Sequence, residues 1–278
     1  MTTTTTATAT QEAFLQAFHA ERPAATAEAF ARGRAPDGRS SYELLCDRVA
    51  GCERVLDLGC GDGLLLEFLA RREEKTRLAG LDLSPESLEL ARRRPALAGA
   101  GLEEGRAQAL PFADGSFDAC VSHMALMLMG EIDHVAAEIA RVLAPGGVLA
   151  CVLGGGAVGG EAYERFLGLL RDTIARAPAA QRIPALGDRR TRSREGLDEV
   201  LAPAGFAPVE WETVAIDLSG TVERVWASVS GLYDLGPLDA AAVEGLRDAF
   251  FADVRDLTTP EGTVPCSFRI HIATARLR

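Results

Sequence analysis

The chain has 278 residues, of which 47% are apolar and 25% charged, as is typical of a single globular domain. Its formal net charge of −11 argues against broad nucleic-acid binding, which needs many Lys and Arg side chains to neutralise phosphates. No segment is long and apolar enough to span a bilayer, and the first ten residues lack the basic and apolar regions of a secretory signal. We therefore expect a cytoplasmic protein with neither a nucleic-acid nor a membrane partner.

The cysteines do not follow a metal-binding or disulfide pattern. They lie at positions 46, 52, 60, 120, 151 and 266, with no Cys-x-x-Cys spacing, and two of them fall inside apolar strands. This distribution favours buried thiols in a reducing compartment over a disulfide framework or a zinc site. No other cluster of His and carboxylate residues has ligand spacing, so we expect no metal.

The N-terminal quarter predicts helices. We expect residues 1–10 to be a disordered tail and residues 11–278 a single domain. Residues 11–34 predict one or two short helices, and a turn with proline and glycine follows at residues 34–39. Ser40 or Ser41 can then cap a helix over residues 41–50.

Strands and helices alternate in the middle of the chain. Short apolar strands are expected at 54–58, 78–83, 119–122 and 148–153. Helices are expected at 64–72, from 85 onwards and at 135–143, the last ended by Pro145-Gly146-Gly147. Such alternation indicates a parallel sheet with helices on both faces.

The second half has longer helical stretches. Helices are expected at 161–177 and 194–204, separated by a loop that carries prolines and arginines, and more helices at 221–258. Strands are expected at 208–218 and 267–277. The last one alternates apolar and polar residues, which predicts a half-buried strand antiparallel to the others.

A glycine-rich turn between a strand and a helix is the most informative motif. Residues 55–63 read V-L-D-L-G-C-G-D-G, with glycines at alternate positions. Glycine lets a ligand approach the backbone because no Cβ is in the way. The dinucleotide pattern G-x-G-x-x-G is broken by Leu64, so a nicotinamide-dependent oxidoreductase is disfavoured.

Three further segments give this turn its context. They are G-L-D-L-S at 80–84, G-R-A-Q-A-L-P-F-A-D-G-S-F-D at 105–118 and R-V-L-A-P-G-G-V-L at 141–149. In this order and spacing the four segments resemble class I methyltransferases that use S-adenosylmethionine (SAM), in particular the type 11-like small-molecule enzymes of bacterial specialised metabolism. The resemblance covers roughly residues 40–155.

The resemblance implies an α/β, Rossmann-like sheet of seven mostly parallel strands with helices on both faces and an antiparallel last strand. Residues 11–45 would form a helical lid, residues 46–155 the SAM-binding core, and residues 156–278 the rest of the sheet with helical cap insertions. SAM would be the cofactor and S-adenosylhomocysteine (SAH) the product. The implied cofactor-binding residues are Tyr42, Asp57, Gly59, Cys60, Gly61, Asp82, Leu83, Ala107, Gln108, Ala109, Ser122 and His123.

Different residues of this set would contact different parts of the cofactor. Gly59 and Gly61 would contact its methionine part, with Asp57 near the amino group, and Asp82 would take the ribose hydroxyls. Arg106 departs from the family, which often has an acidic residue there as an acceptor for the adenine amino group. Arginine cannot accept a hydrogen bond, so either the backbone or the Gln108 amide oxygen would replace that contact.

Two histidines are candidate catalytic residues. His123 ends an apolar strand and can act as a general base toward a hydroxyl or phenol, or shape the pocket, or be a core residue. His19, between aromatic residues of the expected lid, is either catalytic or a surface residue. Asp62 is expected to cap the following helix. His134 and His271 are expected to be structural.

The acceptor is expected to be a small molecule, and a specialised metabolite such as an antibiotic precursor is the leading class by analogy. Met124, Met127 and Met129 favour an apolar or aromatic acceptor, and the arginines at 189, 190, 192 and 194 would suit a carboxylate. Trp226 and Tyr233 lie where the family places substrate-facing residues, with core packing as the favoured alternative for Trp226. The alternatives are an enzyme acting on tRNA or protein, and a SAM- or SAH-binding cyclase or binding module that has lost methyl transfer. The oligomeric state is left open.

Overall fold

The computed structural model describes residues 5–73, 75–231 and 233–278, and its centre is one seven-stranded sheet. The strand order across the sheet is β3-β2-β1-β4-β5-β7-β6. The strands are β1 (Arg54–Leu58), β2 (Arg77–Asp82), β3 (Gly101–Glu104), β4 (Phe117–His123), β5 (Leu143–Ala157), β6 (Glu210–Asp217) and β7 (Ser267–Arg276).

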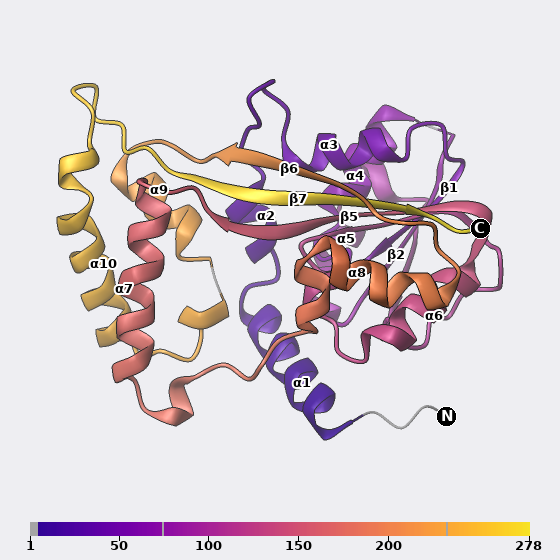
Figure 1. The fold of residues 1–278 in the computed structure, drawn as a ribbon, viewed down its shortest axis with the longest axis horizontal. Coiled ribbons are helices and arrows are strands. Elements are labelled where there is room, and N and C mark those ends of the chain that lie inside the picture. The colour runs from indigo at the N-terminus through magenta and orange to yellow at the C-terminus, as the bar shows by residue number, and fades with distance from the viewer. Residues whose placement is uncertain (1–4, 74, 232) are drawn as a thin grey trace.

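Helices surround this sheet and also extend past one end of it (Figure 1). The α-helices are α1 (Thr6–Glu21), α2 (Ala25–Phe30), α3 (Ser41–Arg48), α4 (Leu64–Arg72), α5 (Pro85–Arg92), α6 (Ile132–Val142), α7 (Ala162–Arg176), α8 (Arg194–Leu201), α9 (Val222–Val229) and α10 (Ala240–Asp253). Seven short 3-10 helices complete the described residues, among them η2 (Leu126–Leu128), η4 (Arg189–Arg192) and η6 (Tyr233–Leu235).

The pairing pattern confirms the predicted fold class. β1 pairs in parallel with β2 and β4, and β4 pairs in parallel with β5. β7 is inserted between β5 and β6 and runs antiparallel to both. The carboxyl ends of β1, β2 and β4 therefore meet at one edge, which is where ligands bind in open parallel sheets.

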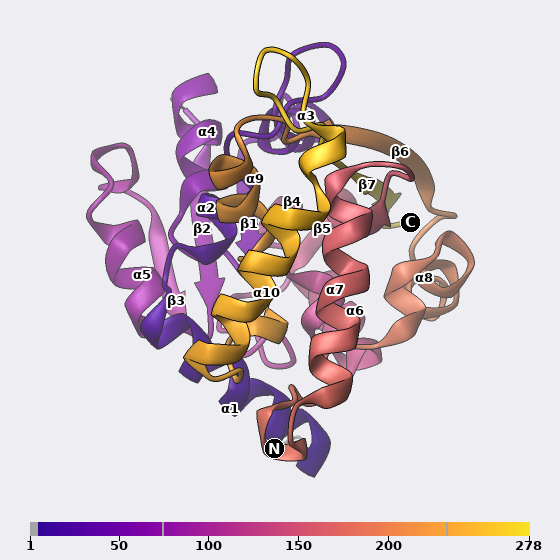
Figure 2. The ribbon, with the colours of Figure 1, turned by 90° about the vertical axis from the view of Figure 1, so that its left-hand side faces the viewer.

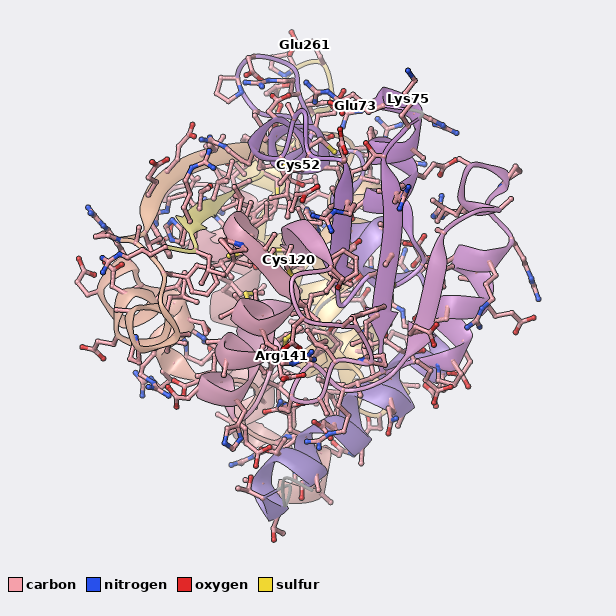
Figure 3. All side chains as sticks on the ribbon, turned by 90° about the vertical axis from the view of Figure 1, so that its right-hand side faces the viewer. Cys52, Glu73, Lys75, Cys120, Arg141 and Glu261 are labelled. Carbon is pink, nitrogen blue, oxygen red and sulfur yellow. The ribbon has the colours of Figure 1, made fainter. Side chains whose placement is uncertain are left out.

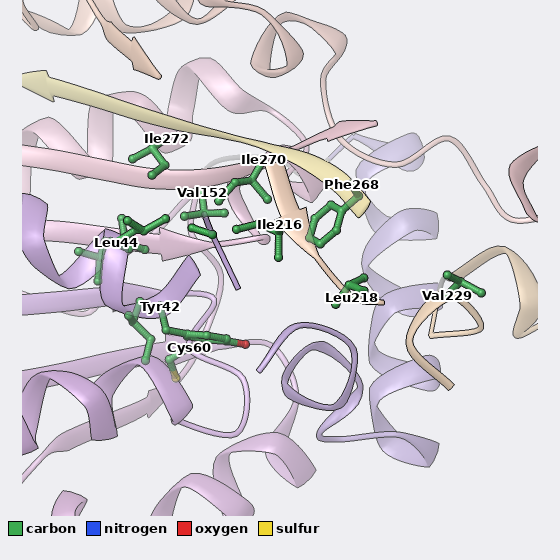
Figure 4. Packing of buried hydrophobic residues seen from close by; sticks show 14 of the residues in the cluster. Tyr42, Leu44, Cys60, Val152, Ile216, Leu218, Val229, Phe268, Ile270 and Ile272 are labelled. Atoms are coloured by element: carbon green, nitrogen blue, oxygen red, sulfur yellow. The ribbon is translucent and has the colours of Figure 1, made fainter. Parts of the chain in front are cut away.

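Successive strand residues pack on opposite faces of the sheet. Val55 contributes to one hydrophobic cluster, with helices α3 and α4, while Leu56 contributes to the other, with α6 and α8. The first cluster reaches from Tyr42 and Cys60 across the sheet to Phe268 (Figure 4). Two apolar faces covered by helices explain why the central strands are short, continuous apolar runs.

Three helices form a cap at the carboxyl end of the sheet. α7, α9 and α10 lie beyond the tip of β5 (Figures 1 and 2), and α10 packs along α7. Phe166 of α7 makes an edge contact with Phe250 of α10, at 5.8 Å between ring centroids, and both are fully buried. The expected cap insertions are thus joined by their own aromatic core.

The structure corrects several expected boundaries. The N-terminal tail is helical from Thr6 onwards because the Thr5 side chain accepts the backbone N–H of Thr8; residues 1–4 lie outside the described residues. The limit of the lid at residue 45 falls inside α3. β5 begins at Leu143 rather than at Val148 and includes Pro145-Gly146-Gly147, which was expected only to end the preceding helix; its register against β4 is irregular. The edge strand β3 was not predicted because its sequence, G-L-E-E, has little apolar character.

Most charged side chains lie at or near the surface, whereas most of the cysteines are buried. Lys75 lies at the periphery and Cys120 in the interior (Figure 3). All six cysteines are free thiols, and all except Cys52 are buried. None of the described helices combines the length and apolarity that crossing a membrane requires.

Candidate functional site

A cavity that is partly open to solvent lies at the carboxyl ends of β1, β2 and β4. The glycine-rich turn after β1, the ends of β2 and β4, and the loop after β3 form its inner wall. α1, the segment before α2, and η6 form the outer wall. Segments from the first 30 residues, the sheet and the C-terminal cap thus meet around one space.

The turn after β1 depends on glycine for its shape. Gly59, Gly61 and Gly63 have φ values of 75°, 53° and 78°, a left-handed conformation that other residues rarely adopt. A Cβ on Gly59 would lie 2.5 Å from the Cβ of Ala125, whereas one on Gly61 would meet nothing within 4 Å. Gly59 therefore permits close packing of two loops, and Gly61 leaves its backbone open to a ligand.

Asp57 is a buried carboxyl group without a partner. Both of its carboxylate oxygens are buried and neither accepts a hydrogen bond in the described part of the chain. Burial, with the nearby Asp82 and Asp62 carboxylates, raises the pKa of Asp57 well above its usual range. Because an unpaired buried polar group is costly, this position fits a ligand that brings a positive charge.

Asp82 ends β2 and ties the neighbouring loops together. Its Oδ2 accepts the backbone N–H of Gly61 at 2.8 Å, and its Oδ1 accepts that of Ser84 at 2.9 Å. Burial raises the pKa of Asp82, and these two amide hydrogen bonds oppose the shift. Carboxylate oxygens have further lone pairs, so Asp82 can still accept hydrogen bonds from ligand hydroxyls.

His123, at the end of β4, is held by stacking and one hydrogen bond. Its ring stacks on Tyr42, with centroids 3.9 Å apart, and its Nε2 lies 2.8 Å from the Ser41 Oγ. Nδ1 is buried without a partner. Burial lowers the pKa of His123 to about 3, so the imidazole is neutral at physiological pH.

His19 and Tyr233 join α1 to the C-terminal cap. His19 Nε2 lies 3.0 Å from the Tyr233 hydroxyl, and His19 Nδ1 is buried without a partner. Burial lowers the pKa of His19, although the Asp82 carboxylate opposes that shift. Burial also raises the pKa of Tyr233. Both side chains are therefore neutral at physiological pH.

Helix α1 contributes polar residues that the sequence analysis missed. Gln11 donates to the Leu128 carbonyl oxygen at 2.6 Å and accepts the Gly187 N–H at 2.8 Å. Gln16 donates to the Leu83 carbonyl oxygen at 3.3 Å, and Glu12 receives two N–H groups of Arg106. All three line the cavity. The sequence signals these three residues only as a polar face on a helix that is otherwise apolar. Such a face does not indicate which part of the protein the helix contacts.

The comparisons with known proteins bear directly on this cavity. A family model described as "Methyltransferase domain" matches residues 56–151. A fatty-acid O-methyltransferase of Mycolicibacterium smegmatis is 41% identical over 95 residues, so the match spans 34% of this chain and only 35% of that protein. A trans-aconitate 2-methyltransferase of Methylobacterium nodulans is 33% identical over 240 residues, which cover 83% of this chain and 89% of that protein. The chain belongs to the class I SAM-dependent methyltransferases.

A solved structure agrees with this methyltransferase assignment at the level of the fold. The YcgJ protein from Bacillus subtilis superimposes with a TM-score of 0.55, covering 86% of this chain and 98% of that one at 18% identity. This superposition confirms the predicted fold, and the family model with the methyltransferase relatives confirms the predicted family and its SAM cofactor.

The cavity of the methyltransferase fits SAM chemically. SAM carries an ammonium group, which can pair with the orphaned Asp57 carboxylate, and a ribose diol, which can donate to Asp82. The cavity is lined by most of the expected cofactor residues: Tyr42, Asp57, Gly59, Cys60, Gly61, Asp82, Leu83, Ala107, Gln108 and His123. His19 and Tyr233 line it as well.

Two expected cofactor residues do not reach the cavity. Ser122 precedes His123 on β4 and so points to the opposite face, where its Oγ donates to the Leu58 carbonyl oxygen and accepts the Leu126 N–H. Ala109 lies in the loop after β3 and is exposed to solvent. Gln108 does line the cavity, but its amide nitrogen donates to the Gly130 carbonyl oxygen at 2.8 Å.

The other residues singled out from the sequence divide clearly. Met124 and Met129 line the cavity, whereas Met127 packs in the hydrophobic cluster under α6 and α8. Trp226 packs against Phe166 and the α10 aromatics, as its core alternative predicts.

Asp62 lines the cavity, accepts the Leu64 N–H at the start of α4 and forms an ion pair with Arg94. His134 is exposed on α6, and His271 lies beside Thr213 on the sheet.

Proposed function

We propose that this methyltransferase transfers the SAM methyl group to an O, N or C nucleophile of a neutral, largely apolar small molecule, such as an intermediate of bacterial specialised metabolism. One observation carries the choice of acceptor. Within the described residues, the cavity is lined by four carboxyl groups and by no Arg or Lys: Glu12, Asp57, Asp62 and Asp82 are the acidic residues.

The chain's own residues would orient the reactants and exclude water. Bound SAM supplies a methyl group activated by the positive charge on its sulfur. Asp57 would hold the ammonium end, Asp82 the ribose, and the left-handed turn at Gly61 would leave its backbone accessible. α1 and η6 line this space opposite the sheet, so the reacting atoms would meet in line in a site with restricted access to solvent.

His123 would serve the acceptor as a neutral imidazole. Burial keeps its pKa at about 3, and the Tyr42 ring and Ser41 hydroxyl fix its orientation. A neutral ring can accept a hydrogen bond from a hydroxyl or phenol and align its oxygen, and with so low a pKa its role would be to position the acceptor rather than to hold its proton. His19 would act from the opposite wall of the cavity. Its unpartnered Nδ1 would orient the acceptor by a hydrogen bond and would not serve as a general base.

No Arg or Lys of the described residues lines the cavity, which argues against a carboxylate-bearing acceptor, because an anion beside these carboxyl groups would be repelled and left unpaired. The arginine cluster at residues 189–194 does not supply one. None of its members lines the cavity, and Arg190 is paired with Asp188 and Asp133. The apolar wall formed by Ala27, Met124 and Leu128 instead favours an aliphatic or aromatic body.

Methyl transfer from isotopically labelled SAM to a matched panel tests this proposal. The panel pairs neutral phenols, alcohols and amines with carboxylate analogues of similar size and includes trans-aconitate. We expect label in neutral acceptors alone, with the mass increase of one methyl group per product. Methylation of trans-aconitate, or of the carboxylates in general, would contradict the neutral acceptor.

The remaining alternatives predict other results from the same assay. A protein that had lost methyl transfer would bind SAH by titration and label no acceptor in the panel. An enzyme acting on tRNA or protein would label macromolecules and leave small molecules unlabelled. Because the cavity is covered by α1 and η6, we consider a small acceptor the better fit.

A further inference from the structure

We propose that Glu12, on α1, accepts the hydrogen bond of the adenine amino group, and that Arg106 positions the Glu12 carboxylate for this contact. The acidic acceptor expected after β3 would thus be supplied by a different part of the chain. The inference rests on SAM lying in the cavity as described above. It concerns which residue recognises the base, which that description leaves open.

The order of strands fixes the direction in which SAM would lie. Across the sheet, β1 carries Asp57 and the glycine turn, β2 ends in Asp82, and the loop after β3 follows. SAM carries its ammonium at one end, its ribose in the middle and its adenine at the other end. If Asp57 pairs with the ammonium and Asp82 with the ribose, the base falls between Leu83 and the loop after β3.

Glu12 is the carboxyl group that faces this part of the cavity. It lines the cavity, whereas Arg106 does not. Arg106 donates from Nε and Nη2 to Glu12 Oε1 at 3.0 and 2.9 Å, and Nε also lies 2.9 Å from Oε2. The Glu12 side chain is 14% exposed and that of Arg106 is 29% exposed. A carboxylate held by one guanidinium still has free lone pairs for a second donor.

The neighbouring polar groups are less suited to this contact. Arg106 has no acceptor atom. Glu131, which lies 3.6 Å from Arg106 Nη2, does not line the cavity, and its Oε1 accepts the Thr5 N–H. Gln108 offers a neutral amide whose nitrogen is bound to Gly130, so its oxygen is the weaker competitor.

Glu12 would also connect recognition of the base with closure of α1. The helix touches the rest of the site through Gln11 and Gln16 as well as through the Glu12–Arg106 pair. The adenine amino group would add one more bond between the helix and the core. The cofactor would therefore help to hold α1 in place over itself.

Titration with SAH and with S-inosylhomocysteine tests the assignment. The second ligand has a carbonyl oxygen in place of the adenine amino group, so it accepts where adenine donates. We expect the wild type to prefer SAH and Glu12→Gln to bind SAH roughly 10-fold more weakly, since a hydrogen bond to a charged group is lost. The glutamine amide can donate to the carbonyl oxygen, so the preference for SAH should fall by about the same factor.

Matched variants separate this outcome from a general effect. Glu21→Gln makes the same change at an exposed position of α1 and should leave both affinities unchanged. Arg106→Lys should reduce the preference in the wild-type background and have no further effect on it in Glu12→Gln, because Arg106 would act through Glu12. Thermal unfolding without ligand checks that each variant folds.

The outcomes distinguish this inference from the proposed function. An unchanged preference for SAH in a folded Glu12→Gln protein would overturn the role of Glu12 while leaving SAM as the cofactor. Failure of the wild type to bind either ligand would overturn the placement of SAM itself. A preference that falls in Glu12→Gln and not in Glu21→Gln would support the assignment.

Discussion

At the scale of single residues, the site contains buried polar atoms that the protein itself leaves unpaired. Asp57 has two such oxygens, and His19 and His123 have one such nitrogen each. Buried polar groups are almost always paired in folded proteins, because desolvation without a hydrogen bond is costly. Their concentration around one cavity is therefore a physical sign of ligand binding that is independent of family resemblance.

Asp57→Asn should separate binding from stability. Burial raises the pKa of the Asp57 carboxyl group and the amide cannot ionise, so at neutral pH we expect the ligand-free variant to be more stable than the wild type. The same change removes the charge that would pair with the SAM ammonium, so SAH binding should weaken by at least roughly 10-fold. Chemical denaturation and SAH titration measure the two effects.

The exposed Asp172 on α7 offers a control for the same chemical change. Asp172→Asn should alter neither quantity, because that residue is exposed to solvent and does not line the cavity. Loss of stability in Asp57→Asn together with unchanged SAH affinity would mean that Asp57 is a structural residue.

At the scale of elements, the docking of α1 decides whether the cavity is closed. The helix approaches the loop after β4 so closely that a Cβ on Gly130 would lie 2.7 Å from Thr8 Oγ1 and 3.0 Å from its Cγ2. Thr8 is itself buried. This contact brings Gln11, Glu12 and His19 over the cavity, and the Thr5 cap fixes where the helix begins.

Gly130→Ala should therefore displace α1 without unfolding the core. We expect roughly 10-fold weaker SAH binding, because overpacking typically costs about 1–3 kcal/mol and relaxation here means moving the helix. A glutamate-specific endoprotease should cleave faster after Glu21, the last residue of α1, and SAH should protect that bond less than in the wild type. The unfolding midpoint should change little.

Gly99→Ala is the matched substitution, because a Cβ there meets nothing within 4 Å. It should leave the cleavage rate and SAH affinity at wild-type values. Equal behaviour of the two alanine variants would show that the approach of Thr8 to Gly130 does not control α1.

At the scale of the whole molecule, the neutral buried histidines make stability depend on pH. His123 has a pKa of about 3 when folded and about 6.5 when unfolded, so between these values the unfolded chain binds the extra proton. The stability that neutral His123 contributes is therefore fully present above about pH 6.5 and is lost as the pH falls toward 3. His19 acts in the same direction, while Asp57 and Asp82, whose pKa values are raised, act in the opposite one.

Comparison of His123→Gln with the wild type isolates this contribution. Between pH 7 and pH 5 the wild type should lose about 2 kcal/mol more unfolding free energy than the variant, since glutamine does not titrate. Chemical denaturation at both pH values measures the difference. His134→Gln, at an exposed position of α6, should behave as the wild type. A variant that loses as much as the wild type would show that His123 is already protonated at pH 5.

Local sequence patterns were enough to predict most of the sheet, the glycine turn, the positions of Asp57 and Asp82 and the cofactor. These features are local. Runs of apolar residues indicate the buried strands, and the glycines at fixed spacing set the shape of the turn within a few residues. Ser122 was misplaced because two neighbouring strand residues cannot both face one cavity. β3 was missed because an exposed edge strand needs few apolar residues.

Which distant residues complete the site depends on how the elements pack in three dimensions. Glu12 meets Arg106, His19 meets Tyr233, and Ser41 meets His123 across 94, 214 and 82 positions of the chain. No local pattern encodes such pairs, because they depend on how α1, α3 and the cap dock on the sheet. The absence of a cation around the cavity, within the described residues, follows in the same way: 28 arginines are present in the sequence, and the fold directs them elsewhere.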